Sequence, residues 1–182
     1  MALSGEKLLT FLPGFHILVL GLLTGMVFHT TFINGLIQFK HLPKHMFGNL
    51  QSKQFPPYFL LQTIFSAILI PTSCHLHGLS FIEFLPRFVK AMERPADMNL
   101  GDFALNGLVL GLCSGLINLV YLGPETTRIM FDRHKLEKAG KEVPSSINSL
   151  FAWLHGIGSL LNLLTLAGAV LCSIWTGSLI KL

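Results

Sequence analysis

Four long stretches of the sequence contain no charged residue. Asp, Glu, Lys and Arg are absent from residues 8–39, 54–82, 103–124 and 143–180, which are 32, 29, 22 and 38 residues long. A helix rises about 1.5 Å per residue, so about 20 apolar residues cross the ~30 Å hydrocarbon core of a bilayer. A soluble helix of this length would carry charges on its outer face. The four stretches therefore predict four membrane-spanning helices.

The composition supports the same fold. Of the 182 residues, 51% are hydrophobic and 12% are charged, and the mean hydropathy is +0.61. A soluble domain is about 25% charged. We predict an all-α, polytopic integral membrane protein with a single four-helix transmembrane domain over residues 1–182. Its spans are expected at about 12–38, 58–77, 103–122 and 147–178, and the last is long enough that it must tilt or project from the bilayer.

The segments between the spans predict one or two interfacial helices and one exposed helix. Residues 44–53 have a small apolar face between two lysines, and we expect Pro56 and Pro57 to end this helix. Residues 80–94 alternate apolar and charged residues with helical spacing, as in an amphipathic helix on the membrane surface. Residues 125–142 hold five basic and four acidic residues and predict a water-exposed helical loop.

The distribution of Lys and Arg predicts the orientation. The first and third loops carry eight of them, and the other side carries five. Basic loops stay in the cytoplasm. We therefore expect loops one and three to be cytoplasmic and both termini to lie on the opposite side.

Glycines recur every four residues in two of the spans. They are Gly21 and Gly25 in the first span and Gly107, Gly111 and Gly115 in the third. Small residues at this spacing let helices approach closely in lipid. A four-helix bundle needs fewer such faces than this chain offers, which favours a further membrane-protein partner.

Polar residues inside the spans are the next candidates for function, because polar groups are costly at depth in a bilayer. The principal ones are His29, Asn34, Asn118, His155 and Asn162. One interpretation is that they form hydrogen bonds between helices. The other is that several of them line a polar cavity for an ion, a metal or a lipid headgroup. The spans contain no carboxylate and no lysine or arginine, so a proton-coupled pump is hard to build from them.

Other classes of function find little support. Cys74, His75 and His77 lie together and suit a soft metal. However, no C-x-x-C or H-E-x-x-H spacing is present, and we predict neither a metal nor a cofactor. The sequence offers no recognisable Ser-His-Asp set and no Gly-rich phosphate loop after a strand, so we predict no enzyme. The net charge of +4 comes from basic residues in loops, where lipid headgroups explain them better than nucleic acid does.

Three motifs resemble the transmembrane protein 205 family of small eukaryotic membrane proteins. The first is Leu42-Pro43-Lys44-His45-x-Phe47-Gly48-x-x-Gln51-Ser52-Lys53-x-Phe55-Pro56, preceded by Gly25, Thr30, Phe32 and Gly35. The second is Asn118-x-x-Tyr121-Leu122-x-Pro124-x-Thr126-Thr127-x-x-Met130, followed by Glu137, Lys138, Gly140 and Lys141. The third is His155-Gly156-x-x-Ser159-x-x-Asn162-Leu163. The family usually has Arg at the position of Lys44. The resemblance implies a four-helix protein of endomembranes or the cell surface, and no particular reaction.

The first of these motifs supplies the candidate binding residues. Lys44, His45, Gln51 and Lys53 present donors at headgroup depth, suited to a lipid phosphate or a partner protein. The alternative is a rigid elbow, fixed by prolines, that sets the angle between the first two spans.

Taken together, the sequence predicts a structural or accessory subunit of a larger membrane complex, and the alternative is a small transporter or channel for a metal ion or small solute. The expected partners are membrane lipids and other membrane-protein subunits. The expected location is a eukaryotic endomembrane, foremost the endoplasmic reticulum, or the plasma membrane.

Overall fold

The regular structure of the chain is helical throughout residues 5–179, the part that the computed structural model describes. The predicted domain limits, 1 and 182, lie outside these residues. The elements, in chain order, are α1 (Gly5–Phe28), η1 (His29–Asn34), α2 (Gly35–His41), α3 (Lys44–Leu76), α4 (Phe81–Glu93), η2 (Pro95–Asp97), α5 (Leu100–Ile117), η3 (Asn118–Leu122), α6 (Gly123–Lys138) and α7 (Ser145–Gly177). The segments η1 and η3 are single π-helical insertions. They join their neighbours into two continuous helices.

Four of the described helices are long and apolar enough to cross a membrane, as predicted. They are Phe11–His41, Lys44–Leu76, Leu100–Lys138 and Ser145–Gly177, with 31, 33, 39 and 33 residues. At about 1.5 Å per residue, even the shortest is roughly 46 Å long, well beyond the ~30 Å of hydrocarbon. The bundle therefore projects from the bilayer.

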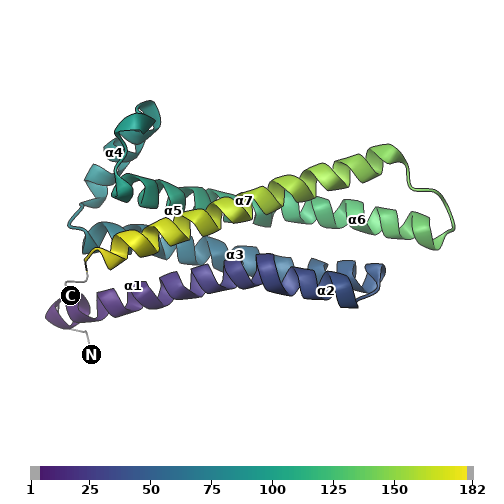
Figure 1. The fold of residues 1–182 in the computed structure, drawn as a ribbon, viewed down its shortest axis with the longest axis horizontal. Coiled ribbons are helices and arrows are strands. Elements are labelled where there is room, and N and C mark those ends of the chain that lie inside the picture. Colours follow the sequence, from purple (N-terminus) through teal and green to yellow (C-terminus); the bar gives the residue numbers. More distant parts are fainter. Residues whose placement is uncertain (1–4, 180–182) are drawn as a thin grey trace.

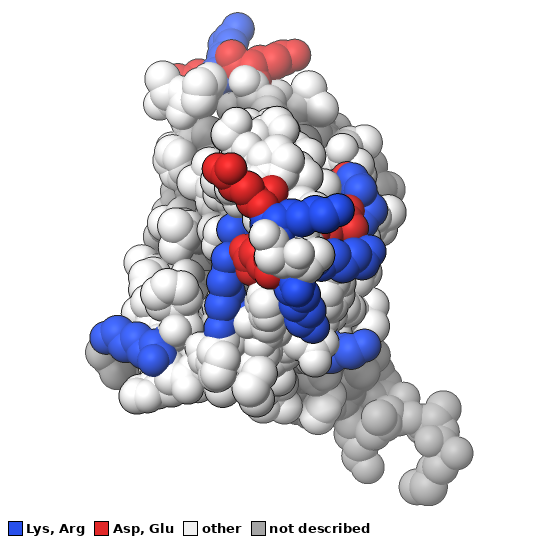
Figure 2. Space-filling view, turned by 90° about the vertical axis from the view of Figure 1, so that its right-hand side faces the viewer, with Lys and Arg blue, Asp and Glu red and all other residues white. Residues whose placement is uncertain are grey.

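The two ends of the bundle differ (Figure 1). One end holds both termini and α4, and we call it the terminal end. The other holds the α2–α3 turn and the α6–α7 connection, and we call it the loop end. Figure 2 looks onto the loop end and shows positive and negative side chains gathered there. Because α6 contributes most of these charges, we expect this end to project into water.

The centre of the bundle is packed around the glycine stripe of α5. The Cα of Gly168 on α7 lies 2.5 Å from where a Cβ on Gly107 would stand, so the two backbones touch. One turn on, Gly111 faces Ser66 and Thr165, and Gly115 faces Thr63. The stripe thus lets α5 contact both α3 and α7 closely, which is its role inside this chain.

The start of α3 differs from the prediction. Residues 44–53 are the first turns of α3, and the helix continues through Pro56, Pro57 and Pro71 instead of ending at the first two. Prolines remove backbone hydrogen bonds, yet neighbouring helices make them tolerable in bundles of this kind. A separate interfacial helix at 44–53 is therefore not formed.

The predicted surface helix at 80–94 is observed as α4. It begins with a capping box, in which the Ser80 hydroxyl accepts from the Glu83 N–H and the Glu83 carboxylate accepts from the Ser80 N–H. Arg87 binds Asp102 at the start of α5 and ties α4 to the bundle. The helix lies crosswise to the bundle axis (Figure 1), and Ile82 and Met92 on it are exposed, as suits a membrane interface.

Candidate ligand-binding cleft

A cavity of about 580 Å³ lies near the loop end, between α3, α6 and α7. We call it the loop-end cleft. Residues within 44–59, 118–134 and 151–162 line it, together with Phe39. Each of these three segments contains most of one of the motifs on which the family resemblance rests. Residues far apart in the chain therefore meet around one space.

Most of the cleft wall is apolar. Side chains from all three segments contribute: Phe47, Phe55, Phe59, Leu119, Leu122, Met130, Phe151 and Leu154. Phe55 and Phe59 stack with their ring centroids 5.3 Å apart. Such a wall is typical of sites for hydrophobic ligands, whose orientation is set by a few polar groups.

Two asparagines supply polar groups at the inner end of the cleft. Asn118 is 1% exposed and Asn162 is 9% exposed, yet Asn118 Nδ2 and Asn162 Oδ1 have no hydrogen-bond partner among the described residues. Asn118 belongs to the π-helical insertion η3, a feature frequent at functional sites. A Cβ on Gly158 would stand 2.9 Å from Asn118 Oδ1, so this glycine leaves room for the amide. One buried donor and one buried acceptor thus remain available.

Arg133 supplies a positive charge at the outer end of the cleft. Its guanidinium carbon lies 4.5 Å from the centre of the Phe151 ring, a cation–π contact. Its Nε is buried without a hydrogen-bond partner, and no described carboxylate lies within 4.0 Å of it. Two other cations of α6 are paired, because Arg128 lies 2.5 Å from Glu125 and Lys135 lies 3.2 Å from Asp132.

A clamp of side chains joins α3 to α6 beside the outer end of the cleft, where Lys44 lines it. Lys44 and His45, in the first turn of α3, both bind the carboxylate of Glu137, His45 through Nε2 at 2.8 Å. The rings of His45 and His134 lie 4.3 Å apart. A Cβ on Gly48 would stand 2.6 Å from Met130 Sδ. The first turns of α3 are thus fitted closely against α6.

The remaining predicted residues of the first motif lie beside the clamp. Gln51 donates to Gln38 at 2.5 Å, and Gln38 in turn donates to Asn34 at 2.8 Å. Gln51 thus belongs to a chain of amides that includes Asn34. Gln51 also lines the cleft. Lys53 is on the outside of α3 and does not line the cleft.

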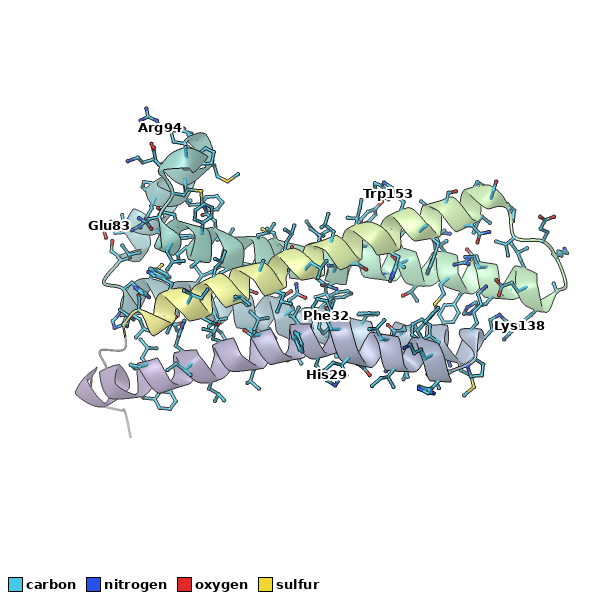
Figure 3. All side chains as sticks on the ribbon, viewed as in Figure 1. His29, Phe32, Glu83, Arg94, Lys138 and Trp153 are labelled. Atoms are coloured by element: carbon cyan, nitrogen blue, oxygen red, sulfur yellow. The ribbon has the colours of Figure 1, made fainter. Side chains whose placement is uncertain are left out.

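The polar residues predicted in the spans divide into two groups. Asn118, His155 and Asn162 line the loop-end cleft, and the His155 ring stacks on Phe151 at 5.8 Å. His29 is exposed and points away from the bundle (Figure 3). The structure thus gathers three of the five residues at one place. Asn34 belongs to the amide chain, and His29 lies on the outer surface.

The glycines of the first span do not meet another helix. Nothing in the described chain lies within 4 Å of a Cβ built on Gly21 or Gly25. This pair therefore faces outward, unlike the stripe of α5.

Sequence reasoning missed a buried polar group at the terminal end. His16 is fully buried, with Nδ1 at 2.8 Å from Thr72 Oγ1 and Nε2 at 3.1 Å from Thr176 Oγ1. A histidine inside a charge-free stretch was the available signal. Nearby, the rings of His77 and Trp175 stack at 3.5 Å. Among the described residues, no three His, Cys, Asp or Glu side chains are placed to hold a metal ion.

Comparisons with known proteins agree with the resemblance. A family model described as "Domain of unknown function (DUF4149)" matches residues 18–135. Transmembrane protein 205 of Danio rerio is 26% identical over 185 residues, an alignment that covers 90% of each chain. No solved structure matches the chain.

Proposed function

The chain belongs to the DUF4149 family, with transmembrane protein 205 among its relatives, and we propose that it is a non-enzymatic membrane protein that binds an amphipathic molecule of the bilayer in the loop-end cleft. The family match includes two of the three cleft segments, 44–59 and 118–134. The third segment, 151–162, lies after it in α7.

The observation that carries this proposal is the convergence of three distant segments on one space with a mixed lining. The volume, about 580 Å³, is within the 300–1,000 Å³ typical of small-molecule sites. Apolar walls favour a hydrophobic ligand, and unpaired polar atoms at both ends favour a ligand with polar groups. Buried polar groups of a native protein normally have partners. Asn118, Asn162 and Arg133 are accordingly expected to find theirs in a ligand.

The position of the cleft opening favours entry from the bilayer. Phe39, His155 and Ser159 lie on the lining and are exposed. All three belong to charge-free stretches, namely 8–39 and 143–180. The charged helix α6 forms the opposite wall. A molecule already dissolved in the membrane can therefore reach the cleft sideways.

The lining does not favour catalysis. It includes hydroxyl groups and the imidazoles of His134 and His155, but no carboxylate is among the described residues that form it. A nucleophile–base pair oriented by an acid, or a pair of acids, cannot be assembled from this set. Binding without chemistry is the simpler function for such a site.

An accessory-subunit role is a second candidate. The stripe of Gly107, Gly111 and Gly115 no longer argues for it, because α5 uses these glycines inside the bundle. The outward pair Gly21 and Gly25 still does. A lone monomer in native mass spectrometry of protein purified from its own membranes would count against this role.

The transporter alternative predicts an effect of Asn162→Leu and none of His29→Ala on solute flux into vesicles, because only Asn162 lines the cleft. Equal flux in both variants and in wild type would exclude a path through the cleft.

The proposed function can be tested with a substitution that fills the cleft with a larger side chain. We expect Ser159→Phe, on the open rim, to lower retention of added phosphatidylcholine several-fold in native mass spectrometry of the delipidated protein. The matched control is Leu160→Phe, which adds a ring one residue away on a side chain that is 55% exposed and outside the lining. Equal lipid retention by wild type and both variants would contradict the proposal.

A further inference from the structure

We propose that the ligand of the loop-end cleft is an anionic phospholipid whose phosphate binds Arg133. This inference rests on the proposed function and specifies its ligand class. It starts from a charge that no carboxylate among the described residues neutralises.

Arg133 is half-buried, and in the described part of the chain no carboxylate pairs with it. The Phe151 ring covers one face of the guanidinium, while Nε is buried and unbonded. Burying a charge without a partner is costly, so a charge retained in such a place is normally compensated. Since the described carboxylates of α6 are engaged by Arg128, Lys135, Lys44 and His45, an anionic ligand is the counter-ion that fits this place.

The chemistry of the group selects phosphate. A guanidinium is planar and presents several N–H donors in a fork that matches two oxygens of a phosphate. The Phe151 ring lies against one face of the guanidinium, and no described residue bonds its terminal N–H groups, which remain for an acceptor. The acyl chain of the same lipid would then run along the apolar wall of Phe47, Phe55 and Leu122.

The local charge balance favours an anionic lipid over a zwitterionic one. Lys44 also lines the cleft, but Glu137 neutralises it. Arg133 therefore leaves one positive charge at the outer end, which a phosphodiester with no other charge would cancel. A choline headgroup would place its ammonium near the unneutralised charge of Arg133, where like charges repel.

The level of Arg133 is that of a lipid headgroup. Trp153 lies two residues from Phe151 on α7, is 60% exposed and points outward (Figure 3). Tryptophans gather at the membrane–water interface. The basic-residue count predicts that the loop end is cytoplasmic, and the cytoplasmic leaflet is the one rich in anionic lipid.

The experiment compares two lipids with the same acyl chains, phosphatidylglycerol and phosphatidylcholine, offered together to the delipidated full-length protein in native mass spectrometry. We expect wild type to retain phosphatidylglycerol about tenfold better, as one charge-assisted contact allows. Arg133→Gln should remove this preference and still retain phosphatidylcholine. The control, Lys135→Gln, makes the same charge change on the same helix at a residue outside the lining and should keep the preference.

Several other outcomes would overturn the inference. Equal retention of both lipids by wild type overturns the inference even if Arg133→Gln fails to fold, and so does an unchanged preference in Arg133→Gln. Loss of phosphatidylglycerol on adding millimolar inorganic phosphate would also overturn it, because the site would then recognise free phosphate. If Ser159→Phe retains both lipids as wild type does, the proposed function itself fails.

Discussion

At the scale of single residues, the glycines of this chain are of two kinds that the sequence does not distinguish. Gly107 and Gly168 hold α5 and α7 in backbone contact, whereas Gly21 and Gly25 border open space. Gly21 and Gly25 have the same four-residue spacing as Gly107 and Gly111, and Gly168 lies in an equally apolar helix. The spacing predicts a close-packing face, but which helix occupies that face depends on the arrangement of the whole bundle.

The first prediction compares these two kinds. In Gly168→Ala, the new Cβ would lie 2.5–2.7 Å from backbone atoms of Gly107, so α5 and α7 must separate. Overpacking of this kind costs about 1–3 kcal/mol. We expect a melting temperature several degrees lower in detergent. Gly25→Ala, with nothing within 4 Å, should leave the melting temperature unchanged or slightly higher. Equal losses in the two variants would show that Gly168 has no special packing role.

The roles of the polar residues follow only in part from the sequence. Asn118, His155 and Asn162 were expected to bond other helices or to line a cavity, and the structure places them on the cleft. In the sequence, Arg133 is one of five basic residues in the exposed segment predicted over residues 125–142, and nothing distinguishes it from the others. That Arg133 has no carboxylate partner among the described residues becomes clear only when the neighbouring ion pairs are known.

At the scale of elements, the hydropathy pattern predicts the spans well and their ends poorly. The four spanning helices are where the charge-free stretches are, and α4 occupies the predicted amphipathic segment. Pro56 and Pro57 were expected to end the helix over residues 44–53, but α3 continues through them. The reason is that the first turns of α3 pack on α6 through Gly48 and the Lys44–Glu137 ion pair, and these tertiary contacts outweigh the local preference.

The start of α4 gives a prediction about pH. The Ser80 backbone N–H, and then its hydroxyl, bind the Glu83 carboxylate and hold its pKa below the ordinary value of 4.5. A lowered folded-state pKa means that the cap is fully formed above the ordinary pKa and is lost as the pH falls through the lowered one. We expect amide-exchange protection in the first turn of α4, corrected for intrinsic rates, to fall below about pH 4.5.

Two variants isolate this effect. Glu83→Gln should remove the pH dependence of protection in that turn, because no carboxylate remains to titrate. Glu93→Gln, at the other end of α4, should retain it. Protection that varies with pH in the same way in Glu83→Gln would rule out the cap as its cause.

At the scale of the whole molecule, the two ends of the bundle differ in structure. The terminal end is a packed four-helix core, and the loop end holds an open cleft between charge-free and charged helices. The sequence predicts that the last span is too long for a bilayer and that α6 is exposed. It does not reveal that the three motifs face one another, because that depends on α3, α7 and the continuous helix α5–η3–α6 each being longer than the hydrocarbon core is thick.

The position of a bound lipid would show whether the loop-end cleft is its binding site. Phosphatidylglycerol with a photoactivatable group in its acyl chain would be crosslinked to the full-length protein in lipid nanodiscs, and the modified residues located by peptide mass spectrometry. We predict adducts within residues 44–59, 118–134 and 151–162, on side chains that line the cleft. Adducts confined to outward-facing residues, such as those around Gly21 and Gly25, would contradict a lipid-binding cleft.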